Sequence, residues 1–93
     1  VKMSATNGHD KTPLKVYDQH EPTYEQAKDF IGGWLEAVTL PNGDLLVIDE
    51  EGKLKGLPVN FFATVVWQEY FGDTDVIVGP AILIRKKVRN KHW

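Results

Sequence analysis

The residues that most often carry out chemistry in proteins are few in this chain and lie far apart. Its three histidines, His9, His20 and His92, stand near the two termini and in one loop, and no pair has the spacing of metal ligands on a helix. The chain has no cysteine, and its one serine, Ser4, lies close to the N-terminus. Catalysis needs a nucleophile, a base and an orienting group together. We therefore expect no enzyme, no cofactor and no metal site.

One acidic run, Asp49-Glu50-Glu51, has side chains that could transfer protons or hold a cation weakly. A solvated turn between two strands explains the same run, and we favour this interpretation because Gly52 follows it directly. The pair Gly32-Gly33 is not a phosphate-binding loop, because no strand precedes it and no helix follows.

The charge of the chain is unevenly distributed. The last nine residues contain five of the 11 Lys and Arg residues and no acid, so all 13 acids lie in the first 84 residues. Such a tail could bind nucleic acid by counterion release, with the terminal Trp93 stacking on a base. The acidic body would repel a phosphate backbone, so nucleic-acid binding is our alternative hypothesis. Its candidate residues are Arg85, Lys86, Lys87, Arg89 and Lys91.

Length and composition predict one small domain. The chain has 93 residues, of which 42% are hydrophobic, enough for one core and too few for two domains. Domains of this size are only marginally stable alone, and self-association is one remedy that remains without disulfides. No apolar stretch reaches the ~20 residues that span a membrane, and no apolar signal segment opens the chain. We expect a cytoplasmic protein with no membrane partner.

The first half of the chain predicts a strand, a helix and a hairpin. Residues 14–17 alternate apolar and polar, as in an edge strand. Thr23 is a good N-cap for a short helix that Gly32 ends. Residues 34–40 and 45–48 predict two strands joined by a turn at Asn42-Gly43, and the second is apolar on both faces, as in a central strand.

The second half predicts a helix and two more short strands. Asn60 caps a helix that runs to about Phe71. Residues 76–78 and 81–84 are apolar and are separated by Gly79-Pro80, which predicts a bulge or a tight turn. The predicted fold class is α+β, with a mixed or antiparallel sheet of four to five strands packed with two helices. Residues 1–13 form a disordered N-terminal arm, 14–84 the domain and 85–93 a basic C-terminal tail.

The second helix carries more aromatic side chains than one buried face needs. At ~100° per residue, Phe62, Val65 and Val66 are expected to face the sheet, and Tyr70 can join them. Trp67 and Phe71 then flank that face and, together with Phe61, form an exposed apolar patch. Exposed aromatic residues are favoured at protein–protein contacts. We therefore take Phe61, Trp67 and Phe71 as the candidate partner-binding residues; a tightly packed small core is the alternative explanation of the same aromatic residues. The expected core comprises Trp34, Leu46, Ile48, Val66 and Ile77.

Several short segments resemble a known family. Gly33-Trp34-Leu35-Glu36 leads a strand, EEGKL occupies 50–54, GLPVN occupies 56–60 and DVIVG occupies 75–79. In this order they resemble a family of small domains of unknown function found on bacteriophages and mobile elements. The resemblance covers a little over half of the chain. It implies a phage-related origin and no known activity.

Three functional hypotheses follow. The first is a non-enzymatic phage accessory protein that binds a host protein, or a second copy of itself, through the aromatic helix. The second is a nucleic-acid-associated module that uses the basic tail. The third is a sponge in which an oligomer encloses a small molecule between subunits; no phosphate-binding pattern supports it directly.

Overall fold

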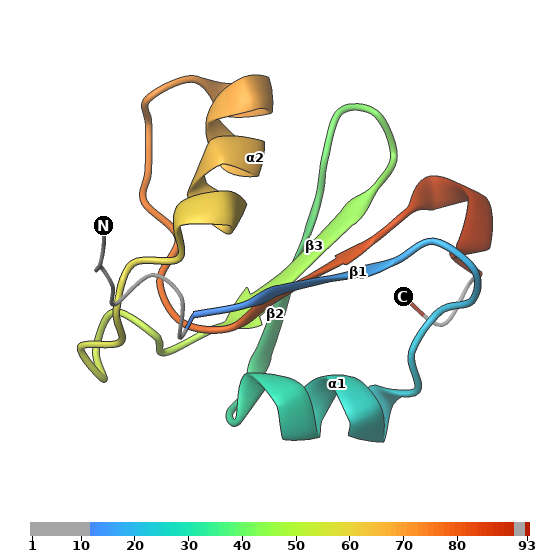
Figure 1. Cartoon of the computed structure of the whole chain (residues 1–93), viewed down its shortest axis with the longest axis horizontal. Coiled ribbons are helices and arrows are strands. Elements are labelled where there is room, and N and C mark those ends of the chain that lie inside the picture. The colour runs from blue at the N-terminus through green and yellow to red at the C-terminus, as the bar shows by residue number, and fades with distance from the viewer. Residues whose placement is uncertain (1–11, 91–92) are drawn as a thin grey trace, which may run out of the picture.

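The fold is a four-stranded sheet with one helix on each face (Figure 1). The structure, a computed structural model, describes residues 12–90 and 93. The α+β class predicted from the sequence is confirmed, with a mixed sheet and two α-helices. The elements, in chain order, are β1 (Leu14–Tyr17), α1 (Tyr24–Ile31), β2 (Leu35–Thr39), β3 (Leu45–Asp49), α2 (Phe61–Phe71), β4 (Ala81–Ile84) and a short 3₁₀ helix, η2 (Lys86–Val88).

The strand order in the sheet is β1-β4-β3-β2. β1 pairs with β4 in parallel, whereas β3 pairs antiparallel with both β4 and β2. The central strands are apolar on both faces because each face is covered by a helix. The predicted edge position of the first strand and the predicted central position of Leu45–Asp49 are both confirmed.

Two apolar cores lie on either side of the sheet. Side chains of β3 and β4 alternate between them, as strand geometry requires. On the α1 side, Val47 and Ile82 pack against Ala27. On the α2 side, Leu46 and Leu83 pack with Ala63. Each helix therefore buries one face against the same two central strands.

The first helix has the ends that its sequence predicts. The Thr23 hydroxyl accepts a hydrogen bond from the Gln26 amide at 3.0 Å, and the Gln26 side chain accepts one from the Thr23 amide at 2.9 Å. This reciprocal pair satisfies two amides that the helix leaves free. Gly32 ends the helix with φ of 81°, a left-handed conformation that glycine adopts at low cost.

The strand predicted at residues 76–78 does not form. Only Val78 makes an isolated bridge, with Val59. The hydroxyl of Thr64 on α2 accepts a hydrogen bond from the Ile77 amide at 2.9 Å and donates one to its carbonyl at 3.2 Å, and the Asn60 amide donates to that carbonyl as well. These backbone groups are satisfied by the helix, so the segment runs as a loop into β4.

At both ends, described residues beyond the predicted domain 14–84 contact it. Thr12 is buried, and the Pro13 carbonyl accepts a hydrogen bond from the Ala81 amide at 3.1 Å, so these two residues belong to the fold and not to an arm. Residues 1–11 lie outside the described part of the chain. At the other end, η2 and Trp93 pack back onto the α1 side of the sheet.

The predicted core is confirmed for Leu46 and Ile77, which are fully covered. Ile48 and Val66 are only half-buried. Trp34 was expected inside and is 60% exposed. It lies directly before β2, an edge strand, where no further strand covers it, and the Lys28 ammonium lies 4.2 Å from the centre of its ring.

Candidate functional site

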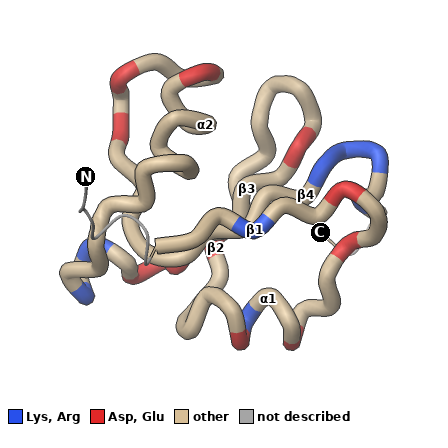
Figure 2. Tube along the Cα trace, in the orientation of Figure 1, with Lys and Arg blue, Asp and Glu red and all other residues tan. Residues whose placement is uncertain are grey.

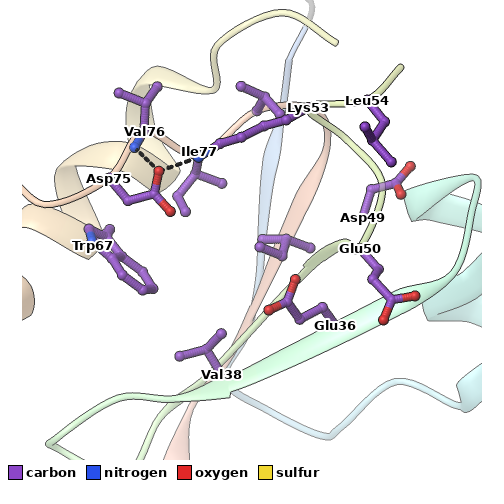
Figure 3. Close-up of a pocket in the computed structure, with 12 residues that line it drawn as sticks. Glu36, Val38, Asp49, Glu50, Lys53, Leu54, Trp67, Asp75, Val76 and Ile77 are labelled. Carbon is purple, nitrogen blue, oxygen red and sulfur yellow. Dashed lines mark hydrogen bonds and ion pairs between the residues drawn. The ribbon is translucent and has the colours of Figure 1, made fainter. Parts of the chain in front are cut away.

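A groove of about 180 Å³ lies between β2, α2 and the loop that precedes β4 (Figure 3). Its apolar lining includes Val38 and Ile48 from the sheet and Trp67 from the helix. Its rim is charged, with Glu36, Glu50, Lys53 and Asp75. Sequence reasoning did not find this groove, because its walls come from segments distant in the chain.

Strand pairing positions the sheet side of the groove. β2 and β3 are in register, with Glu36 opposite Ile48 and Val38 opposite Leu46. Because side chains alternate between faces, these four point toward α2. Trp67 closes the groove from the helix side, where its indole N–H donates to the Thr74 hydroxyl at 2.9 Å.

The one lysine on the rim of the groove is already paired. The Lys53 ammonium forms an ion pair with the Asp75 carboxylate, which also accepts from the Val76 amide at 2.7 Å. These two hydrogen bonds hold the pKa of Asp75 below its ordinary value, against the opposing effect of burial. The carboxylates of Glu36 and Glu50 have no hydrogen-bond or ion-pair partner among the described residues. Their end of the groove therefore carries uncompensated negative charge.

The acidic turn has a structural role at Asp49. Burial alone would raise the pKa of Asp49. The hydrogen bond from Lys55 at 2.7 Å, the hydrogen bond from the Glu51 amide at 2.8 Å and the charge of Lys55 lower it by more than burial raises it, so the net shift is downward. A carboxylate held in its ionised form is a poor proton donor. Within the described residues, no group of three or more His, Cys, Asp or Glu side chains could hold a metal ion.

The predicted partner-binding residues are not brought together on one exposed surface. Phe61 is exposed, but Trp67 and Phe71 are half-buried against the α2-side core, with ring centroids 4.4 Å apart. Phe62 and Val65, expected to face the sheet, are 56% and 46% exposed. The predicted orientation of the helix is wrong for Phe62 and Val65, whereas Val66 packs against the α2-side core as expected.

Two small residues explain this orientation. Ala63 is completely buried, and Thr64, also buried, makes both of its side-chain hydrogen bonds to Ile77. These two buried side chains fix which side of the helix faces the α2-side core at its N-terminal end. The larger residues on either side of them are turned outward there. The adjacent small residues Ala63 and Thr64 indicate the buried side of the helix in the sequence, but the prediction gave more weight to the aromatic residues.

The exposed apolar surface of the helix is therefore a different set, which we call the α2 patch. It comprises Val59, Phe61, Phe62 and Val65, each 46–56% exposed. The Phe61 and Phe62 rings meet edge to face, with centroids 5.5 Å apart. The patch lies at the N-terminal half of α2, away from the sheet.

The basic tail folds back onto the body (Figure 2). Arg85 pairs with Asp44 at 3.0 Å, and Asp44 also accepts from the Lys86 amide at 2.8 Å. The Arg89 guanidinium donates to the carbonyl oxygens of Gly43 at 2.8 Å and Trp93 at 3.2 Å. Of the predicted nucleic-acid-binding residues, Lys86 and Lys87 present exposed side chains without a described partner. Lys91 lies outside the described residues.

Comparison with known proteins gives a family and little else. Residues 7–92 match the family described as a domain of unknown function, DUF3846. No curated protein and no solved structure matches the chain. In the described part of the chain, neither helix is long and apolar enough to cross a membrane.

Proposed function

The chain belongs to the DUF3846 family of domains of unknown function, and we propose that it acts without catalysis, by binding another protein through the α2 patch. The observation that carries this proposal is the exposure of Phe61 and Phe62 on a helix whose opposite face is already packed. A surface helix normally has one apolar face, and a second apolar face on the same helix is typical of an interaction surface.

The apolar character of the outer face is local. In the C-terminal half of α2 the exposed positions are polar, at Gln68 and Glu69. The patch therefore has a polar border, as protein–protein contacts usually do. Aromatic side chains in such a position contribute most when a partner excludes water from them.

A protein fits this surface better than a nucleic acid does. No described lysine or arginine belongs to α2, and its one charged residue is Glu69. Both arginines of the tail are bound to the body. The resemblance to phage and mobile-element domains makes a host protein the partner that we favour, with a second copy of the chain as the competing partner.

The test compares the full chain with two serine variants. Phe61→Ser/Phe62→Ser removes the aromatic part of the patch, and Tyr24→Ser removes an equally exposed ring from α1, on the other side of the sheet. We expect a defined protein to co-purify with the wild-type chain and with Tyr24→Ser, to bind them after both partners are purified, and to be lost with the double variant.

Sedimentation of the purified chain over a range of concentrations separates the two partners. A dimer that is lost in the Phe61→Ser/Phe62→Ser variant would identify a second copy of the chain, and not a host protein, as the partner. Equal binding of a purified partner to the wild-type chain and the double variant would contradict the proposal.

A further inference from the structure

The outer edge of β2 is free. β2 ends the sheet, and no described strand lies beyond it. The Trp34 carbonyl accepts from the Glu50 amide at 2.8 Å, and the Leu40 amide donates to the Asp44 carbonyl at 2.8 Å. Because backbone groups alternate in direction along an antiparallel strand, the N–H and C=O groups of Leu35, Ala37 and Thr39 point away from β3. Three residues therefore offer unpaired donors and acceptors to an incoming strand.

This edge has few of the features that usually protect edge strands. Proteins blunt such edges with lysine, proline or bulges. β2 has none of these, and its register with β3 runs without a break from Leu35 to Thr39. The opposite edge, β1, carries the exposed Lys15. The only charge on β2 is Glu36.

The groove lies directly beside this edge, on its α2 side (Figure 3). In a strand added to β2, the side chains on that side would stand next to Glu36 and Val38, two positions apart. The carboxylates of Glu36 and Glu50 have no described partner, whereas Val38 faces the indole of Trp67 across the groove. The complementary strand has a basic residue at one position and an apolar residue two positions away.

We propose that β2 binds an extended basic segment of another protein as a fifth strand of the sheet, with an arginine or lysine beside Glu36 and an apolar side chain beside Val38. Main-chain hydrogen bonds to the edge would supply affinity, and the groove would supply sequence preference, as in other cases of strand addition. This inference goes beyond the proposed function and does not rest on it, because it uses β2 and not the α2 patch.

Charge argues against a second copy of the chain as the occupant. Two β2 strands paired edge to edge would bring two grooves together, each with Glu36 and Glu50 uncompensated. Like charges this close destabilise a pair of strands. A basic segment would neutralise this negative charge, which therefore favours its binding.

The probe for this site is the capped peptide Thr-Val-Thr-Arg-Thr. Antiparallel to β2, it places Arg beside Glu36, Val beside Val38 and threonines on the other face. The control Thr-Val-Arg-Thr-Thr has the same composition, but its Arg moves to the opposite face. A third peptide carries an N-methyl group on the central threonine, opposite Ala37, which removes one main-chain donor.

Titration into the ¹⁵N-labelled full chain is the measurement. We expect Thr-Val-Thr-Arg-Thr to shift the amides of Leu35, Ala37 and Thr39 and to slow their hydrogen exchange. The control and the N-methylated peptides should bind more weakly. Glu36→Lys should lower the affinity about tenfold, because attraction across the strands becomes repulsion. Glu69→Lys, the matched charge change on α2, should not alter it.

A second variant tests the main chain. Ala37→Pro removes an outward amide without breaking a bond to β3, as edge strands tolerate, and should abolish binding. If this variant unfolds, the N-methylated peptide decides the same point. The proposal is overturned by shifts confined to other surfaces, by affinities that ignore Glu36→Lys and N-methylation, by no binding at millimolar peptide, or by a dimer of the chain that occupies β2.

Discussion

The side-chain amide of Asn60 donates a hydrogen bond of 3.0 Å to the carbonyl oxygen of Pro13, which lies 47 positions earlier in the chain. The same amide donates to the Gly79 carbonyl at 2.8 Å, and its oxygen accepts from the Ala63 amide at 3.0 Å. One fully buried side chain thus joins the start of β1, the start of α2 and the loop into β4. It fixes the helix against the sheet at the end where the α2 patch begins.

Replacing Asn60 should therefore cost more than loss of a helix cap. We expect Asn60→Ala to lower the free energy of unfolding by about 2–4 kcal/mol, because it removes the cap, leaves the Gly79 carbonyl without its described donor and takes one of two donors from the Pro13 carbonyl. The matched control is Thr23→Ala at the exposed cap of α1, which should cost about 1 kcal/mol. Urea unfolding of the full chain measures both. Equal losses would show that the contacts to Pro13 and Gly79 contribute nothing.

Leu46 and Ile48 should respond differently to truncation, although both lie on β3 and point toward α2. Leu46 is completely buried, whereas Ile48 borders the open groove. Leu46→Ala should cost about 2–5 kcal/mol, and Ile48→Ala should cost less, because solvent already reaches its site. Chemical denaturation compares the two. A larger loss for Ile48→Ala would mean that the groove is closed in solution.

Much of this fold could be predicted from local sequence. Thr23 and Gly32 define the ends of α1, Asn60 begins α2, and the doubly apolar run at 45–48 predicts a central strand. Each of these signals affects only residues a few positions away in the chain, so it can be interpreted without knowing the rest of the fold.

The predictions that were wrong concern segments whose structure depends on residues far away in the chain. Residues 76–78 have the composition of a strand, but Thr64 and Asn60 take the backbone groups of Ile77. Trp34 is apolar enough for a core, but it lies directly before an edge strand. The groove could not be predicted either, because no local pattern places Trp67 opposite Val38.

Asp49 should make stability depend on pH in the acid range. Its pKa in the folded state lies below the ordinary value, so the unfolded chain binds the proton more readily. The contribution is complete above about pH 5, where an unfolded aspartate is almost fully ionised, and is lost progressively as the pH falls through the lower folded pKa. Free energies of unfolding measured from acid to neutral pH should rise less steeply for Asp49→Asn. A wild-type slope in that variant would assign the effect to other groups.

The tail should contribute to stability as well as charge. Removing residues 89–93 takes the Trp93 ring off the α1-side core and the Arg89 guanidinium off Gly43. We expect a loss of about 1–3 kcal/mol. Lys86→Gln/Lys87→Gln should leave stability unchanged, because both side chains are exposed. This charge-only pair, and not truncation, is therefore the proper test of nucleic-acid binding by the tail. Unaltered stability after truncation would contradict the packing of Trp93.

The aromatic residues of α2 should separate into two classes when truncated. Trp67 packs against the α2-side core, contacts the Phe71 ring and donates to Thr74. Trp67→Ala should therefore cost about 2–4 kcal/mol, toward the lower end for a large core residue because it is only half-buried. Phe62 is 56% exposed, so Phe62→Ala should change the free energy of unfolding by less than about 0.5 kcal/mol. Partner binding should show the reverse, with Phe62→Ala weakening it and Trp67→Ala acting only through the fold. Thermal and urea unfolding give the stabilities, and titration against the purified partner gives the affinities. If Phe62→Ala destabilises the monomer as much as Trp67→Ala does, the patch is part of the core and cannot be a docking surface.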